Sequence, residues 1–282
     1  MVVGSVWMAT LEAVFLRQLS DQVSLGQVLL FRSGIQLLVV VIVGRVVLGG
    51  FGAIVETRRL REHLIRGGLA AVSWWCYYMS FKSLTLALAT TLTFSSQLFV
   101  LLLAWPMLRE RVSRAQLVAT VIGFIGVMVA ARMWNPTTLG WGVSYGLISA
   151  FLGAVMILIT RKLSFTDRNE TILFYMSLAV FVSAIPQSLV DWRPLQGVSL
   201  TLLLLMSLTG TLGSWLIVEA YRRAEAPTLA PYGYVRLIFA AGFGYWLFGD
   251  VIRNSTLIGA LLIVASTLGL WLISARKGRK PA

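Results

Sequence analysis

The fold follows from apolar runs such as LGQVLLFRSGIQLLVVVIVGRVVL at residues 25–48, in which only Arg32 and Arg45 are charged. A helix needs about 20 apolar residues to cross the hydrocarbon core of a bilayer. Runs of about this length recur along the chain, and the longest break between them, 49–63, can hold only a short surface helix. They predict ten spans, at about 2–19, 25–48, 64–83, 85–108, 115–133, 141–160, 170–190, 198–220, 228–249 and 255–275.

The composition also indicates a polytopic membrane protein. Of the 282 residues, 58% are hydrophobic and 12% are charged, whereas a soluble domain is about half apolar and about a quarter charged. These values exclude a soluble enzyme, a disordered chain and a coiled coil. The single cysteine, Cys76, excludes a disulfide framework and a thiolate metal site, and the single histidine, His63, leaves little for a hydrolytic triad. We therefore expect no catalysis, no cofactor and no metal.

The distribution of Lys and Arg predicts the orientation. With ten spans and a cytoplasmic N-terminus, 17 of the 24 basic residues fall in cytoplasmic loops and the tail, and 4 fall in outer loops. Cytoplasmic loops of membrane proteins carry such an excess. The bias predicts that both termini are cytoplasmic and that the protein lies in the inner (plasma) membrane. It also explains the net charge of +13 without a nucleic-acid partner.

The second half of the chain repeats the first at an offset of 140 residues. The offset aligns Trp75 with Trp215 and Glu110 with Asp250. Because each half holds five spans, the second copy enters the membrane in the opposite orientation, as in alternating-access transporters. We expect a first repeat, a second repeat and a basic tail, at 1–133, 140–276 and 277–282.

Several motifs connect the chain to a known family. They are FRS at 31–33, the small-residue-rich stretch at 86–129 that begins LALATTLTFSSQ, APTLAPYGYVRLIFAAGFGYWLFGD at 226–250 and LIGALLIVAS at 257–266. With these motifs the sequence resembles the drug/metabolite transporter superfamily, EamA type. TDRNETILFY at 166–175 is similar to the subgroup that contains S-adenosylmethionine uptake carriers. The resemblance implies ten helices with cytoplasmic termini, and a central cavity formed chiefly by spans 1, 3, 4, 6, 8 and 9.

Three charged residues within the spans are candidates for transport. Glu12 lies about ten residues into the first span, close to mid-membrane at about 1.5 Å per residue. A carboxylate there could bind a substrate ammonium, titrate to couple transport to protons, or form a structural pair with Arg32 or Arg236. Arg236 could hold a substrate carboxylate or clamp Glu12. For Arg32, in the second span, we expect packing or gating.

Aromatic and polar side chains form a second group of candidates. Trp74 and Tyr78 share one helix face and could hold a cation or stack a purine, or they could form an interfacial belt. In the fourth span, Ser96 and Gln97 could be ligands or could join helices.

The eighth and ninth spans add further candidates. TGTLGSW at 209–215 indicates close helix packing, and Trp215 ends it as a further candidate. Pro227 and Pro231 are expected to start and to bend the ninth span. The backbone opened there would bring Tyr232 and Tyr234 to the substrate.

These features predict an all-α transporter of a small polar metabolite, an amino acid or a derived compound such as S-adenosylmethionine, working by alternating access. Glu12 is also the predicted coupling residue, and the absence of a Walker A motif argues against ATP hydrolysis. The alternatives are a lipid or lysolipid flippase, a lipid-modifying membrane enzyme and a non-transporting scaffold subunit. The expected partners are the metabolite and the bilayer, and the protein is expected to be a monomer or a homodimer. The predicted substrate-binding residues are Glu12, Trp74, Tyr78, Ser96, Gln97, Trp215, Tyr232, Tyr234 and Arg236.

Overall fold

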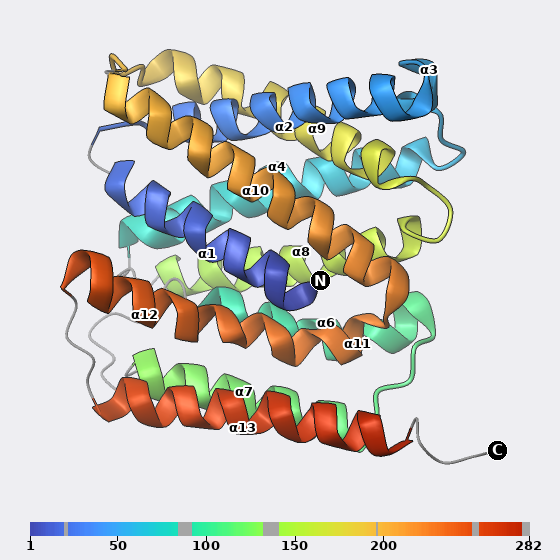
Figure 1. Ribbon diagram of the computed structural model, residues 1–282, viewed down its shortest axis with the longest axis vertical. Coiled ribbons are helices and arrows are strands. Elements are labelled where there is room, and N and C mark those ends of the chain that lie inside the picture. Colours follow the sequence, from blue (N-terminus) through green and yellow to red (C-terminus); the bar gives the residue numbers. More distant parts are fainter. Residues whose placement is uncertain (20–21, 84–91, 132–140, 196, 250–253, 278–282) are drawn as a thin grey trace. The chain divides into compact units, whose positions relative to one another are not determined.

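The computed structural model describes residues 1–19, 22–83, 92–131, 141–195, 197–249 and 254–277. Every regular element in these ranges is helical (Figure 1), as the all-α prediction requires. The elements are α1 (Val2–Leu19), α2 (Leu25–Leu48), α3 (Gly52–Val55), α4 (Leu60–Ser83), α6 (Ser96–Leu108), α7 (Arg114–Ala131), α8 (Trp141–Leu163), α9 (Asn169–Val190), α10 (Gly197–Arg223), α11 (Ala226–Leu229), the 3-10 helix η1 (Ala230–Tyr234), α12 (Val235–Phe248) and α13 (Asn254–Lys277).

The long helices coincide closely with the predicted spans. Within the described ranges, five of them (α1, α2, α8, α9 and α10) are long and apolar enough to cross a membrane. Local chemistry sets their ends. At the start of α2 the Ser24 side chain accepts the backbone N–H of Gln27, whose own side chain bonds back to Ser24. The helix ends at Gly49, which adopts the left-handed conformation (φ 75°) that glycine tolerates best.

The break at 49–63 holds the short helix α3 and also the first turn of α4. Ile54 of α3 is fully buried against α2, where a Cβ added to Gly44 would lie 2.5 Å from the Ile54 side chain. The charged segment ETRRLREH at 56–63 does not remain a loop throughout, because α4 begins at Leu60. This extra turn forms because His63, the residue that ends the segment, is buried against the rest of the fold.

The ninth predicted span is interrupted. It consists of α11, η1 and α12 in succession, with Pro227 in the first turn of α11 and Pro231 within η1. Proline lacks a backbone N–H, and its ring disfavours a continuous α-helix, so the tighter 3-10 turn forms here. α6 likewise begins inside its predicted span, at Ser96 after a turn at Ser95.

The chain packs as two compact units, each with helices from both predicted repeats. Unit 1 comprises Met1–Ala71 and Ile159–Arg223, and unit 2 comprises Val72–Leu158 and Ala224–Ala282. α4 and α8 each run from one unit into the other. The boundaries of packing therefore do not follow the boundaries of the sequence repeats.

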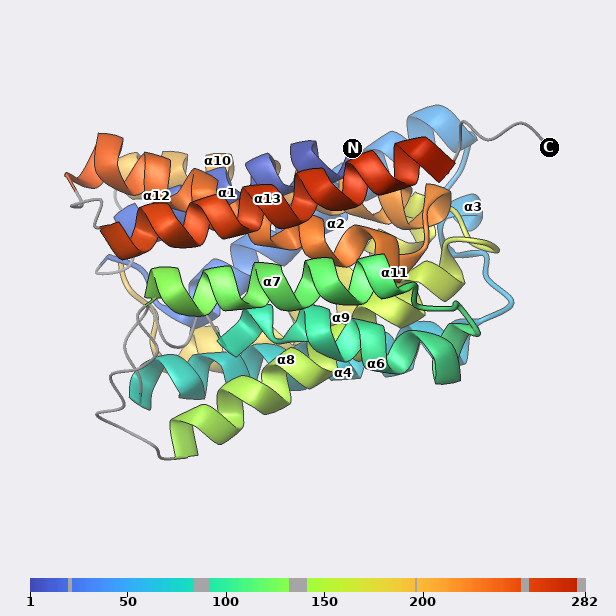
Figure 2. The ribbon, with the colours of Figure 1, turned by 90° about the horizontal axis from the view of Figure 1, so that it is seen from below.

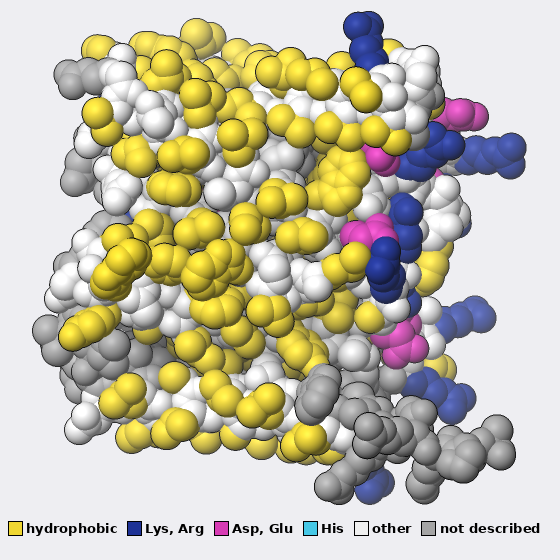
Figure 3. Space-filling model, in the orientation of Figure 1, with side chains coloured by type: hydrophobic (Ala, Val, Ile, Leu, Met, Phe, Trp, Pro, Cys, Tyr) yellow, Lys and Arg dark blue, Asp and Glu magenta, His cyan; other side chains and the backbone are white. Residues whose placement is uncertain are grey.

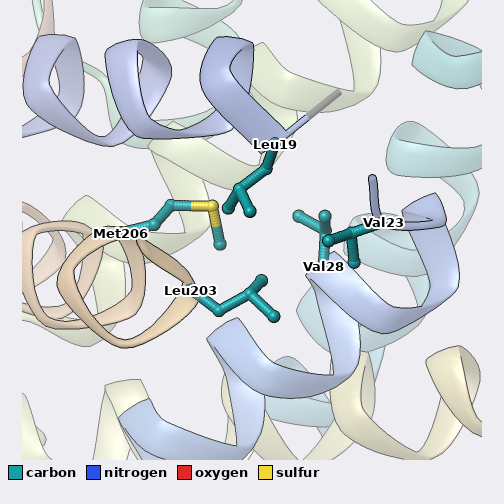
Figure 4. Packing of buried hydrophobic residues seen from close by; sticks show 5 residues of the cluster. All are labelled: Leu19, Val23, Val28, Leu203 and Met206. Carbon is teal, nitrogen blue, oxygen red and sulfur yellow. The ribbon is translucent and has the colours of Figure 1, made fainter. Parts of the chain in front are cut away.

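In unit 1, α1 packs along α10 and α2 packs along α9. The second pair is very close, because a Cβ added to Gly26 would lie 2.5 Å from the backbone nitrogen of Ser188. Glycine allows helix backbones to approach in this way. Figure 4 shows a buried apolar cluster between α1, α2 and α10, formed by Leu19, Val23, Val28, Leu203 and Met206.

In unit 2, α7 and α13 lie side by side over most of their length (Figures 1 and 2). A Cβ added to Gly126 would lie 2.8 Å from the carbonyl oxygen of Gly259, so the two backbones nearly touch. The break in the ninth span packs against this pair. The buried cluster there is formed by Phe94, Val127, Tyr234 and Ile263.

The sides of the long helices are apolar on the outside. Val46 of α2 is 79% exposed and Leu212 of α10 is 50% exposed. In Figure 3 hydrophobic side chains cover the visible sides of the helices of unit 1. The charged side chains gather at the end of unit 1 where α3 and the last turn of α10 lie. This distribution is the one that helices in contact with lipid require.

Candidate functional site

An ion pair joins α1 and α2 within unit 1. Arg32 donates from Nε to Glu12 Oε1 at 2.5 Å, and the two side chains are 15% and 20% exposed. Glu12 lies near the middle of α1. Charges this poorly solvated need each other, because either one alone would be costly among apolar helices.

Two further hydrogen bonds hold the Arg32 guanidinium. Its Nη1 donates to Gln36 Oε1 at 3.1 Å, and its Nη2 donates to Ser214 Oγ at 3.3 Å. Gln36 is one turn further along α2 and is 1% exposed, while Ser214 belongs to α10. Three helices therefore fix both the position and the plane of the guanidinium.

Gly210 of α10 makes room for the Glu12 carboxylate. A Cβ at this position would lie 2.6 Å from Glu12 Oε1 and 2.9 Å from Oε2. Any larger residue would therefore displace the carboxylate. The sequence predicts close helix packing for TGTLGSW at 209–215, and the structure shows what that packing encloses.

The structure selects one of the two partners that the sequence leaves open for Glu12. The partner is Arg32, whereas Arg236 is exposed on the first turn of α12, in unit 2. Packing or gating was the role expected for Arg32, and a structural pair of Glu12 with Arg32 was one of the alternatives left open; the structure shows that pair. Arg32 and Gln36 are four residues apart and share one face of an otherwise apolar helix, but this spacing does not identify a partner on α1.

In unit 2 the structure brings together two predicted residues and the break in the ninth span. Ser96 and Gln97 lie in the first turn of α6, which packs against η1. A Cβ added to Gly233 of η1 would lie 2.7 Å from Gln97 Nε2. Gln97 is half-buried, and its amide has no hydrogen bond among the residues that the structure describes. Tyr232, also in η1, is half-buried.

Tyr234 occupies a different environment. It is 0% exposed, and its ring lies edge-on to Phe94 with centroids 5.9 Å apart. Gly123 of α7 accommodates the ring, since a Cβ there would lie 2.4 Å from Tyr234 Cδ2. The structure therefore places Tyr234 in the packing of unit 2.

The predicted aromatic residues are spread over the two units. Trp74 of α4, in unit 2, is half-buried and stacks edge-on with Tyr77 at 5.9 Å between centroids. Trp215 of unit 1 is half-buried and follows Ser214, which holds Arg32. Tyr78 lies in α4, but its side chain is outside the described part of the chain, as are Asp250 and the tail at 278–282.

A second polar cluster lies at one end of unit 1. Asp167, between α8 and α9, accepts hydrogen bonds from Thr57 Oγ1 at 2.6 Å and from His63 Nε2 at 2.7 Å. The Arg222 guanidinium donates to the backbone carbonyl of Asp167 at 2.7 Å. The sequence placed His63 at the end of the break at 49–63 and indicated no partner for it. It lacked any signal for this cluster, because His63 and Asp167 are 104 residues apart.

Burial and hydrogen bonding shift both titratable groups of this cluster. Burial lowers the pKa of His63, and the Asp167 carboxylate only partly opposes that shift. Burial would raise the pKa of Asp167, but hydrogen bonds from His63, Thr57 and Thr166 outweigh burial and lower it. The pair therefore favours a neutral imidazole that donates to an ionised carboxylate.

The described residues contain no group of three or more His, Cys, Asp and Glu side chains that could bind a metal. The chemistry available at the Glu12 and Arg32 pair is ionic and hydrogen-bonding recognition. Such a site can bind and release a ligand.

Comparison with known proteins places the chain in a family. The EamA-like transporter family matches residues 1–132 and again residues 140–272. A solved crystal structure superposes with a TM-score of 0.84 over 97% of both chains at 14% identity, which shows a shared fold.

Several relatives are named as transporters. An S-adenosylmethionine uptake transporter of Rickettsia felis is 30% identical over 76% of this chain and 72% of its own length. A riboflavin transporter of Rhizobium johnstonii is 30% identical over 78% of this chain and 73% of its own length. A pseudopaline exporter of Pseudomonas aeruginosa is 25% identical over 90% of this chain and 88% of its own length. With its apolar helices, the chain is a multi-pass inner-membrane protein, and it belongs to the EamA-like transporter family.

Proposed function

We propose that this protein is a secondary transporter of a small polar metabolite, an amino acid or a derived compound such as S-adenosylmethionine. The observation that carries the proposal is the pair formed by Glu12 and Arg32, two partly accessible charges between helices with apolar outer sides. Ionisable groups inside a membrane protein are costly and mark substrate or proton pathways. The names of the relatives agree with a small-molecule substrate.

The proposed mechanism is alternating access by a protein with ten spans, two inverted repeats and cytoplasmic termini. Two pairs of helices at corresponding places in the repeats, α2 with α9 and α7 with α13, pack against each other. A two-fold axis in the membrane plane would pair equivalent helices in this way. Because each unit contains helices of both repeats, units 1 and 2 are the bodies proposed to move.

The remaining predicted residues are proposed to contact the substrate along its path. Gln97 is the best supported of them, because its amide is half-buried within a predicted span and lacks a hydrogen bond among the described residues. Tyr234 is instead proposed to hold the broken ninth span against α7. The other proposed contacts are Trp74, Tyr78, Ser96, Trp215 and Tyr232, whereas Arg236, exposed on the first turn of α12, is proposed to lie outside the set of substrate contacts.

Counterflow in liposomes tests this function. Purified protein would be reconstituted in vesicles loaded with unlabelled S-adenosylmethionine or neutral amino acids, and the entry of the labelled compound would be measured. We expect saturable exchange of at least one compound, abolished by Glu12→Gln in protein that elutes as the wild type does. Absence of exchange for every compound would contradict the proposal and favour a lipid flippase or a scaffold.

A further inference from the structure

The Glu12 and Arg32 pair leaves specific hydrogen-bonding groups unused. Glu12 accepts through Oε1, and its Oε2 has no hydrogen bond from any residue that the structure describes. A guanidinium carries five N–H groups. Arg32 uses one on Nε, one on Nη1 and one on Nη2, so one N–H on each terminal nitrogen is left over within the described part of the chain.

The unused hydrogen-bonding groups of Glu12 and Arg32 match a ligand that carries both an ammonium and a carboxylate group. One carboxylate oxygen can accept from an ammonium group, and the unused N–H groups of a guanidinium can donate to a carboxylate. In an α-amino acid the ammonium and the carboxylate are attached to the same carbon. Recognition of both therefore needs an acid and a base that are close to each other, as Glu12 and Arg32 are.

The charge balance favours the same ligand class. A simple cation at Glu12 would have to compete with Arg32, which is held by three hydrogen bonds, and a simple anion at Arg32 would approach Glu12. A zwitterion adds no net charge to a pair that is itself neutral. It therefore avoids the cost of an uncompensated charge in a poorly solvated site.

We propose that Glu12 and Arg32 together form the binding site for the α-amino and α-carboxylate groups of the substrate. Arg32, and not Arg236, is the residue that contacts the carboxylate. Gln36 acts as a positioning residue, since it holds Nη1 from a fully buried place on α2. The site belongs entirely to α1, α2 and α10. This inference rests on the proposed transport function and adds to it the residues that recognise the amino-acid group of the substrate.

Competition in the counterflow assay tests the assignment. Labelled S-adenosylmethionine would be the probe, with unlabelled S-adenosylmethionine, its decarboxylated form and methylthioadenosine as competitors. The second competitor lacks the carboxylate, and the third lacks the whole amino-acid group. We expect the wild type to favour the intact compound over the decarboxylated one by about tenfold or more, since a bidentate charge-assisted contact is lost.

The variants identify the residue responsible. Arg32→Gln is expected to bring the two inhibition constants within about twofold of each other, and Arg32→Lys to fall between, because Lys keeps the charge but lacks the planar fork. Lys can still pair with Glu12, so this variant keeps the test valid if Arg32→Gln does not fold. Arg236→Gln is expected to keep the full preference.

The outcomes separate the two proposals. Saturable exchange that keeps its carboxylate preference in both Arg32 variants, or loses it in Arg236→Gln alone, would overturn the site and leave the transport function standing. Wild-type protein that exchanges neither S-adenosylmethionine nor any amino acid would overturn both. Because each result is a ratio of two inhibition constants, it does not depend on the amount of active protein.

Discussion

Replacing Gly210 by alanine is expected to impair transport more than it destabilises the fold. The new Cβ would lie 2.6 Å from Glu12 Oε1, and ordinary contact begins at 3.4 Å, so the carboxylate has to move by about 0.8 Å. The atoms in the way are the end of a flexible side chain. α1 and α10 can therefore stay in place while the carboxylate shifts away from Arg32.

The magnitude follows from two opposing effects. A hydrogen bond to a charged group contributes about 1.5–3 kcal/mol, and alanine is favoured over glycine inside a helix by about 0.5–1 kcal/mol. The net loss of unfolding free energy is therefore about 1–2 kcal/mol. Substrate affinity, which depends on the position of the carboxylate, is expected to fall by about tenfold or more, since 1.4 kcal/mol corresponds to a factor of ten.

The assay compares Gly210→Ala with Gly68→Ala in counterflow and in thermal unfolding. Gly68 is the matched control, because a Cβ there has no heavy atom within 4 Å. We expect the control to transport as the wild type does, and Gly210→Ala to lose affinity while it elutes as a single species. Wild-type affinity in Gly210→Ala would refute the argument that α10 fixes the position of Glu12.

Three other predictions concern stability. Gly26→Ala should lower the melting temperature strongly, because the new Cβ would lie 2.5 Å from the backbone nitrogen of Ser188. Overpacking of this kind costs about 1–3 kcal/mol or more. An unchanged melting temperature would contradict this close contact. Stability should fall as the pH drops below 6.5, because the unfolded chain protonates His63 before the folded protein does. It should fall again below 3.8, because the unfolded chain protonates Asp167 while the folded protein, in which the pKa of Asp167 is lowered, still holds it ionised. A melting temperature independent of pH between 7 and 5 would exclude a buried neutral His63. Arg109 ends α6 at φ 57°, so Arg109→Gly should stabilise by about 1 kcal/mol, and a lower melting temperature would show that its side chain matters more than the strain.

The helices were predictable because each apolar run is long and ends at a clear signal. The bounds of α1 and α2 agree with the prediction, and Pro227 and Pro231 correctly marked the break in the ninth span. The first turn of α4 was not predicted, because its reason lies in a distant contact to Asp167. Hydropathy reports the preference for lipid, and it carries no information on such partners.

The candidate site could be predicted in part. Glu12 stood out because a carboxylate in an apolar run is costly. The choice between Arg32 and Arg236 depended on which helices pack together, and spacing along the sequence cannot decide that. Tyr234 was expected to contact the substrate because it follows the prolines of the ninth span, but its buried ring faces Phe94. An aromatic residue near a proline break can fill the break as well as line a pathway.

The packing of α7 against α13 has a consequence for how the protein is made. Some 120 residues separate the end of α7 from the start of α13, and a ribosome adds about 5–20 residues per second. For roughly 6–25 seconds the face of α7 around Gly126 is inserted without its neighbour. During that interval lipid or an insertase must shield it. In unit 2, α7 and α13 therefore pack against each other only after both have been inserted. Substitutions on this face of α7 should reduce the yield of protein during synthesis before they affect the finished protein.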